Sequence, residues 1–391
     1  MATKLNLVFR QTTELANFLK VNDVKVYIVP PEVSATTWVN GDPWVLVRLE
    51  TDAGICGWGH AYTLYDREQV IARNVFRLAR IVDGMDPFCI KRFMISATER
   101  IKASEHGIEV SAAAAGIEIA LWDIVGKVLE TPVHHLLGGP CKDRVRLYAN
   151  CWSNQIRSPD QFASFAEQQV RRGFKSVKIY PFLYNVPTQF GIACIASVRE
   201  AVGSDVAIFI DMLEGMPKGD SSSLYDAFRK YDVSWLEDPA PAKNIEELAE
   251  IRRHSLLPVI TGEEVFTKND FARICEAQAA DILNPEVALL GILGVKEVAT
   301  IAEAYGMQIA VHNANTMTIG LAAAIQAAAV TPNSQWVEFF PTLEAGSNTF
   351  SSFPFELDET GSIPISNAPG LGVQVDQSIL NDMELKWHYQ K

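Results

Sequence analysis

Eight short runs rich in β-branched and aromatic residues recur between residues 145 and 340, and helix-like stretches separate them. The helix-like stretches, such as DQFASFAEQQVRRG and GVKEVATIAEAYG, carry apolar residues at three- and four-residue spacing. Such alternation predicts parallel strands, and eight units predict a closed (β/α)8 barrel of the TIM type. The runs are, in order, VRLYAN, SVKIY, VAIFID, VSWLED, VITGEE, DILNPE, QIAVHN and WVEFF.

Polar residues stand at or just after the ends of six of these runs, at a nearly constant spacing. Their separations are 26, 26, 23, 26 and 26 residues, about one strand–helix unit each. A single acidic residue after a strand is commonly a helix N-cap. Six in register indicate side chains that converge at the barrel mouth, where this fold carries its active sites. The residues are Asp211, Glu237, Glu263, Glu286, His312 and Glu338.

Three of these residues form a candidate metal site. Asp211, Glu237 and Glu263 follow three consecutive strands and offer hard oxygen ligands, which suit Mg²⁺, with Mn²⁺ as a substitute. Close carboxylates repel one another without a cation, so a metal also answers an electrostatic problem. A bound cation can hold a substrate carboxylate and take up the charge that develops when the adjacent C–H loses its proton.

Candidate acids and bases flank the predicted metal site. His312 lies beyond it in the strand order, and Glu286 is placed to fix one tautomer of the imidazole. Lys178 and Tyr180 alternate along SVKIY and therefore share one face of that strand. Glu338 either hydrogen-bonds a substrate carboxylate or acts as an acid, with a structural role as the alternative.

The region before the barrel has a different pattern of predicted strands and helices. VKVYIV, PWVLVRLET and GICGWGHA predict strands, with DAG as a hairpin turn between the last two. The Ala-rich stretch EVSAAAAGIEIALWDIVGKVL predicts a closely packed helix. We expect three parts: residues 1–140, with 1–22 as an extension ahead of the first strand, the barrel at 141–345, and a turn-rich tail at 346–391 that returns to the first part.

Composition narrows the partners and the compartment. A net charge of −13 disfavours nucleic acid or an anionic membrane as the main partner. Six cysteines without paired spacing favour free thiols in a reducing compartment. The apolar run LNLVF is too short for a signal-peptide core, and no run approaches a membrane span, so we expect a cytoplasmic location.

The ordered motifs resemble the enolase superfamily, specifically its mandelate racemase subgroup. The resemblance spans roughly residues 23–375 and includes GIEIALWDIVGK, HLLGG and PGLGV. It implies an α+β capping domain over a modified barrel, and Mg²⁺-dependent removal of the proton α to a carboxylate through an enediolate. The residues to which it assigns the metal and a His–acid pair are Asp211, Glu237, Glu263, His312 and Glu286.

Several positions depart from the subgroup pattern. Tyr180 stands where family racemases usually carry a second Lys, and some acid-sugar dehydratases of the subgroup use a Tyr paired with a nearby Arg or Lys. Lys178 is therefore expected to lower the pKa of Tyr180 so that a phenolate serves as the base. Glu286 replaces the usual Asp, and Leu213 replaces a common Asn, with Glu214 beside it as a candidate substrate contact. No Lys ends the sixth strand, which argues against the cycloisomerase and dipeptide-epimerase subgroup and against enolase itself.

These features favour dehydration of an acid sugar to a 2-keto-3-deoxy acid. Tyr180 or His312 would take the C2 proton, and His312 could protonate the departing C3 hydroxyl. A racemase or epimerase with Tyr180 and His312 on opposite faces, or a lactone cycloisomerase, could use the same site. An inert metal-binding relative is a further alternative, and a Schiff-base aldolase using Lys178 would leave the carboxylates unexplained.

Substrate choice is expected to depend on a loop of the capping region. The resemblance places this loop near residues 33–42, VSATTWVNGD, with Trp38 as a candidate ligand contact. His60, in GWGH where the family pattern is GWGE, is a second candidate. The resemblance also implies a small-molecule carboxylate partner and assembly as a homo-oligomer, from dimer to octamer.

Overall fold

The structure is a computed structural model. It describes residues 19–30, 43–63, 66–103, 107–153, 156–183, 186–216, 221–314, 316 and 318–385.

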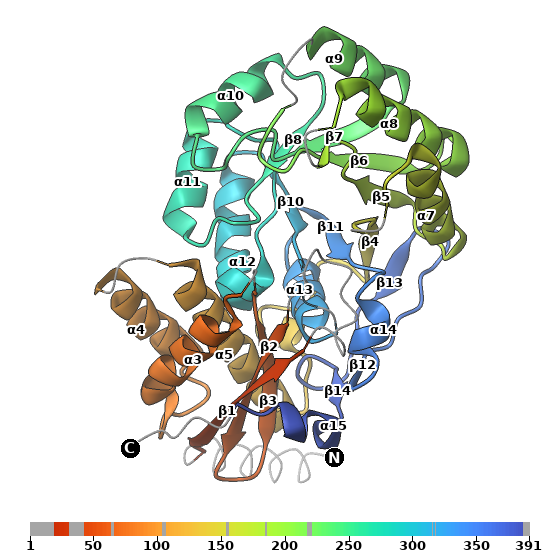
Figure 1. The fold of residues 1–391 in the computed structure, drawn as a ribbon. Coiled ribbons are helices and arrows are strands. Elements are labelled where there is room, and N and C mark those ends of the chain that lie inside the picture. The colour runs from red at the N-terminus through yellow and green to blue at the C-terminus, as the bar shows by residue number, and fades with distance from the viewer. Residues whose placement is uncertain are drawn as a thin grey trace.

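Eight parallel strands close into a barrel with helices on its outside, as predicted (Figure 1). Neighbouring strands pair in chain order, and the last pairs with the first through Glu338 and Tyr148. In this register Asp211 lies directly beside Glu237. The strands are β4 (Arg144–Asn150), β5 (Ser176–Ile179), β6 (Ala207–Asp211), β7 (Val233–Glu237), β8 (Val259–Thr261), β9 (Ile282–Leu283), β10 (Gln308–Val311) and β11 (Ser334–Phe339).

Local sequence explains the start of one barrel helix and the burial of another. Ser158 accepts the N–H of Gln161 and Pro159 takes the first helical position, so the chain turns into α7 there. The last barrel helix, Ile319–Ala329, is buried along its whole length, which explains its nearly unbroken apolar sequence. The helices are α7 (Pro159–Arg171), α8 (Thr188–Val202), α9 (Ser221–Lys230), α10 (Ile245–His254), α11 (Lys268–Glu276), α12 (Val287–Ala304) and α13 (Ile319–Ala329).

An apolar layer, here called the barrel floor, fills the barrel below its polar mouth. Side chains two positions apart on a strand face the same way. Phe209 therefore lies beneath Asp211, and Trp235 lies beneath Glu237. The Phe209 and Trp235 rings stack with centroids 3.4 Å apart. The other buried members of the barrel floor are Tyr148, Ile260, Ile282 and Ala310.

A three-stranded antiparallel sheet and its helices form a cap beside the barrel (Figure 1). Gly57 and Gly59 let the long helix α5 lie directly on strand β3: a Cβ added to Gly59 would come within 1.8 Å of the Gly116 carbonyl oxygen. The cap elements are β1 (Val21–Val29), β2 (Trp44–Thr51), β3 (Cys56–Ala61), α3 (Glu68–Val82), α4 (Ile90–Ala103), α5 (Ile108–Val128) and α6 (Val133–Leu136).

The first strand begins earlier than predicted. β1 starts at Val21, inside the segment 1–22 that we expected to precede it, so this limit is wrong. The Val21 N–H donates to the carbonyl of Met85, and a bulge between Val21 and Asp23 keeps the strand paired with β2. The local reason is that Val21 is fully buried and gains a backbone partner.

The tail contacts both the cap and the barrel. It returns to the cap as expected, where the Leu371 N–H donates to Asp123 and Tyr27 forms a β-bridge with Glu384. It also adds β13 antiparallel to barrel strand β4, which the sequence did not predict. The tail elements are α14 (Glu344–Ser347), β12 (Ser351–Ser352), β13 (Ser362–Pro364), β14 (Gln374–Val375), α15 (Gln377–Leu380) and the 3₁₀ helix η2 (Asn381–Met383).

All six cysteines are free thiols, as expected. Among the helices described above, none combines the length and the apolar character that crossing a bilayer requires.

Candidate active site

Lys178 is the positive centre of the barrel mouth. Its Nζ lies 2.7 Å from Glu237 Oε1, 2.8 Å from Glu338 Oε1 and 3.4 Å from Asp211 Oδ2. All four side chains are almost completely buried. Burial by itself lowers the pKa of Lys178, but Glu237 and Glu338 outweigh it and raise that pKa well above its usual value. Lys178 is therefore a charged ammonium.

His312 is surrounded by carboxylates. Its Nδ1 lies 2.8 Å from Glu286 Oε2, and its Nε2 lies 2.9 Å from Glu263 Oε2 and 3.1 Å from Glu338 Oε2. Burial lowers the pKa of His312, yet Glu338 and Glu263 reverse the shift and raise that pKa well above its usual value. The surrounding carboxylates therefore favour the imidazolium form of His312, which has a proton to give up.

Glu286 is fixed by the start of its own helix. It is the N-cap of α12, and its Oε1 accepts the N–H of Ala288 at 2.7 Å. Its Oε2 accepts the N–H of Ala314 at 2.9 Å as well as facing His312. The extra methylene of Glu relative to Asp lets one carboxylate cap the helix and orient the imidazole together.

The carboxylates have unmet capacity that fits a divalent cation. Asp211 Oδ2 and Glu237 Oε2 are buried and accept no hydrogen bond within the described part of the chain. Burial raises the pKa of Asp211 to about 6 and that of Glu237 to about 8, so keeping both ionised is costly without added positive charge. Ligand atoms of Glu237, Glu263 and His312 lie within 4.8 Å of one another. Carboxylate oxygens are the ligands that Mg²⁺ prefers, so within this group Glu237 and Glu263 fit the cation better than His312.

Two asparagines also hydrogen-bond to the buried polar side chains of the barrel mouth, and they were not predicted from the sequence. Asn150 Nδ2 donates to Tyr180 Oη and to Glu338 Oε1, both at 2.7 Å. Asn284 Nδ2 donates to Glu237 Oε1 at 2.9 Å. Each stands two positions after a barrel-floor residue, in VRLYAN and DILNPE. That spacing is a signal in the sequence from which both asparagines could have been predicted.

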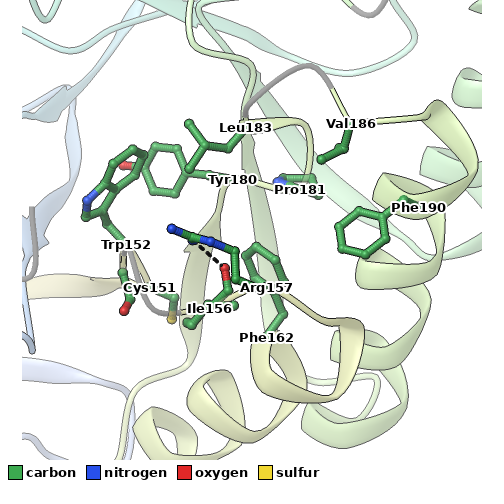
Figure 2. A pocket seen from close by; sticks show the side chains of 11 residues that line it. Cys151, Trp152, Ile156, Arg157, Phe162, Tyr180, Pro181, Leu183, Val186 and Phe190 are labelled. Atoms are coloured by element: carbon green, nitrogen blue, oxygen red, sulfur yellow. Dashed lines mark hydrogen bonds between the residues drawn. The ribbon is translucent and has the colours of Figure 1, made fainter. Parts of the chain in front are cut away.

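Tyr180 lies between Asn150 and a small side pocket. Figure 2 shows its ring against Trp152, with which it makes an edge-to-face contact at 4.6 Å between centroids. The pocket holds about 60 Å³ and is lined mainly by apolar residues of the segments after β4 and β5. Burial raises the pKa of Tyr180 well above its usual value. Lys178 lowers it, as expected, but burial outweighs that effect, so the predicted net depression is wrong for this structure.

Two predicted substrate contacts, Glu214 and His60, lie apart from this network. Glu214 is exposed, in a turn where the Leu213 N–H donates to Asp211 Oδ1 at 2.9 Å and so helps to fix that carboxylate. His60 is buried in the cap sheet against Trp44, and its role stays a prediction. Trp38 and the loop 33–42 lie outside the described residues.

Comparison with known families agrees with this architecture. Residues 18–138 match the family model for the mandelate racemase/muconate lactonizing enzyme N-terminal domain, and residues 161–379 match the enolase C-terminal domain-like model. The chain belongs to the mandelate racemase group of the enolase superfamily.

Several relatives with named activities are similar to this chain over most of its length. D-xylonate dehydratase of Haloferax volcanii is 30% identical over 87% of this chain and 85% of that protein. D-galactonate dehydratase of Ralstonia pickettii is 29% identical, over 93% and 94%. D-galactarolactone cycloisomerase of Agrobacterium fabrum is 27% identical, over 94% and 99%. A solved enolase structure from environmental sequencing of the Sargasso Sea has a TM-score of 0.86 at 28% identity, covering 94% of this chain and 97% of that one.

Proposed function

We propose that this chain is a Mg²⁺-dependent hydro-lyase that converts an acid sugar to a 2-keto-3-deoxy acid. The observation that carries the proposal is one buried barrel mouth that holds a His312 imidazolium beside under-coordinated carboxylates and a charged Lys178. The similarity to proteins named D-xylonate and D-galactonate dehydratase supports the reaction class.

Asp211, Glu237 and Glu263 would hold the Mg²⁺, with Mn²⁺ as a substitute. When bound, the cation would supply positive charge at the substrate carboxylate, which makes the neighbouring C–H more acidic. Lys178 holds Glu237 and Glu338 in place and offsets their charge at the same time.

The proton transfers are assigned to two side chains. Tyr180 is assigned as the acceptor of the C2 proton; Lys178 and the N–H of Asn150 favour the ionised phenol that this step requires, and a bound cation would add its positive charge to them against the opposing effect of burial. His312 gives a proton to the C3 hydroxyl, which leaves as water while the C2–C3 double bond forms. Glu286 keeps the imidazole aligned, and the resulting enol tautomerises to the 2-keto-3-deoxy acid.

A lactone cycloisomerase is the second candidate, because the relative from Agrobacterium fabrum is named as one. A racemase or epimerase would use the same proton transfers without loss of water. A racemase or epimerase removes the C2 proton and retains the C3 hydroxyl, so its product separates it from the leading proposal, whereas a lactone cycloisomerase is separated by its need for a lactone as substrate.

The deciding measurement is proton NMR in D₂O with Mg²⁺ and a panel of C4–C6 mono- and diacid sugars. A 2-keto-3-deoxy product is expected. Exchange at C2 without that product would favour racemisation, reaction of an added sugar-acid lactone with the open acids left unreacted would favour cycloisomerisation, and no reaction with any substrate would favour an inert metal-binding relative.

Two substitutions separate the roles of the proton-transfer residues. Tyr180→Phe is expected to abolish both C2 exchange and dehydration. His312→Asn is expected to retain C2 exchange while lowering dehydration about 10²- to 10⁴-fold, because only the departing hydroxyl needs its proton. Tyr148→Phe, in the barrel floor, is the control and should retain both. Loss of exchange in His312→Asn with exchange kept in Tyr180→Phe would reverse the assignment.

The remaining expectations concern the setting of the enzyme. Six free thiols support a reducing, cytoplasmic location. Assembly as a homo-oligomer, from dimer to octamer, stays a prediction.

A further inference from the structure

Glu118 is a buried carboxylate of the cap that contacts a helix of the barrel. It lies in the middle of α5, and its Oε2 and Oε1 accept the N–H groups of Ile292 and Leu293, each at 2.9 Å. The indole N–H of Trp122 donates to Oε1 at 2.7 Å and fixes the side chain. Unpaired N–H groups at a helix start favour a carboxylate, so Glu118 serves as a helix cap supplied from another part of the chain.

The barrel helix α12 is two helices joined at a kink. Gly291 has φ 71° and ψ 170°, a conformation that breaks the helix and is favourable for glycine. One turn, residues 287–290, precedes it, and the second helix starts at Ile292. A Cβ added to Gly291 would lie 2.5 Å from Glu118 Oε2. The kink therefore forms directly against Glu118.

The turn before the kink carries the partner of His312. Glu286 caps this turn and holds His312 Nδ1 at 2.8 Å. The carbonyl of Ala288, in the same turn, accepts the N–H of Tyr62 from the end of the cap sheet at 3.1 Å. The cap thus holds the turn on both sides, through Tyr62 before the kink and Glu118 after it.

We infer that Glu118 is a positioning residue for His312. It fixes the turn that bears Glu286 across the kink at Gly291, and so couples the seating of the cap on the barrel to the alignment of the imidazole. The kinetic consequence of this inference rests on the proposed function, whereas its geometric consequence does not.

The test compares two amide substitutions on the same helix in the full chain. Glu118→Gln keeps the size of the side chain but leaves one oxygen for two N–H donors of α12. Asp123→Asn is the matched control, because Asp123 is also buried on α5 and accepts two backbone N–H groups, from Trp58 and Leu371, neither of them on α12. The readout is the set of ring N–H resonances of ¹⁵N-labelled histidines. The resonances that disappear in His312→Asn are assigned to His312.

The expected result is that the His312 ring N–H signals shift in Glu118→Gln and stay in place in Asp123→Asn. Unchanged His312 signals in Glu118→Gln, or equal shifts in both variants, would overturn the inference. If Glu118→Gln does not fold, Trp122→Phe removes only the indole donor and should shift the same signals less.

Kinetics add a second readout with whichever acid sugar the native chain dehydrates. Glu118→Gln is expected to lower kcat about 10- to 100-fold with little change in KM, while Asp123→Asn keeps its kcat. An unchanged kcat in Glu118→Gln would count against the inference. Failure of every acid sugar to react would contradict the proposed function alone, because the NMR comparison still decides the position of His312.

Discussion

His60 is buried in the cap sheet, and neither of its ring nitrogens has a hydrogen-bond partner in the part of the chain that the structure describes. Burial lowers its pKa to about 3, from an unfolded value near 6.5. Between these values the unfolded chain binds a proton that the folded chain does not. The free energy of unfolding should therefore fall as the pH drops from about 6.5 towards 3, at about 1.4 kcal/mol per pH unit.

A substitution isolates this contribution. His60→Phe keeps a ring of similar size and removes the titration. Relative to the native chain, its free energy of unfolding should gain about 2 kcal/mol between pH 7 and pH 5. Denaturant unfolding at the two pH values measures the difference. His254→Phe, at an exposed site, is the control, and an equal acid sensitivity of the His60 variant and the native chain would refute the argument.

The parts of the site that the sequence predicts depend on a local repeat, and the parts that it does not predict depend on contacts between segments far apart in the chain. The 26-residue spacing of Asp211, Glu237 and Glu263 was visible because each strand–helix unit repeats the same geometry. The contact between Lys178 and Glu338 was not, because it requires β11 to close against β4 and bring distant segments together. The repeat predicts that the barrel closes, but it does not specify which side chains the closure brings into contact.

At the scale of elements, the contact between α5 and β3 depends on the absence of side chains. A Cβ at Gly59 would overlap the carbonyl oxygen of Gly116, which belongs to rigid helix backbone. Gly59→Ala should therefore push α5 off the sheet and lower the free energy of unfolding by about 1–3 kcal/mol. Gly215→Ala, where an added Cβ meets nothing within 4 Å, is the control in thermal unfolding. Equal midpoints for the two variants would contradict this packing argument.

The start of α12 differs from the start that its local sequence predicts. The stretch GVKEVATIAEAYG predicted a helix from residue 294, but α12 begins at Val287 and is interrupted at Gly291. The sequence contains the glycine but not the reason for the break, because the capping carboxylate of Glu118 comes from 174 residues earlier. By contrast, α7 lies within two residues of its predicted stretch at each end, since its own Ser158 cap and its apolar spacing define it.

At the scale of the whole molecule, cation binding should stabilise the fold. Mg²⁺ binds the folded carboxylates and not the dispersed ones, so at 100 times its dissociation constant it should add about 2.7 kcal/mol to the free energy of unfolding. Thermal unfolding with Mg²⁺ and after EDTA measures the rise in Tm. NaCl at equal ionic strength is the control for screening. Asp211→Asn should lose most of the rise, and a full rise in that variant would exclude Asp211 as a ligand.

The barrel floor has a consequence for the order of events during turnover. Stacked Phe209 and Trp235 fill the barrel directly beneath Asp211 and Glu237, so among the described residues the barrel interior offers no route to these carboxylates from below. A cation bound at Asp211 and Glu237 would lie between the barrel floor and the substrate, so it has to bind before the substrate and dissociate after it. Metal loading should therefore precede substrate in a compulsory sequence, and a seated substrate should protect the metal from chelators in solution. Product and fresh substrate then use the same side of the barrel, so a new substrate binds only after the product has dissociated.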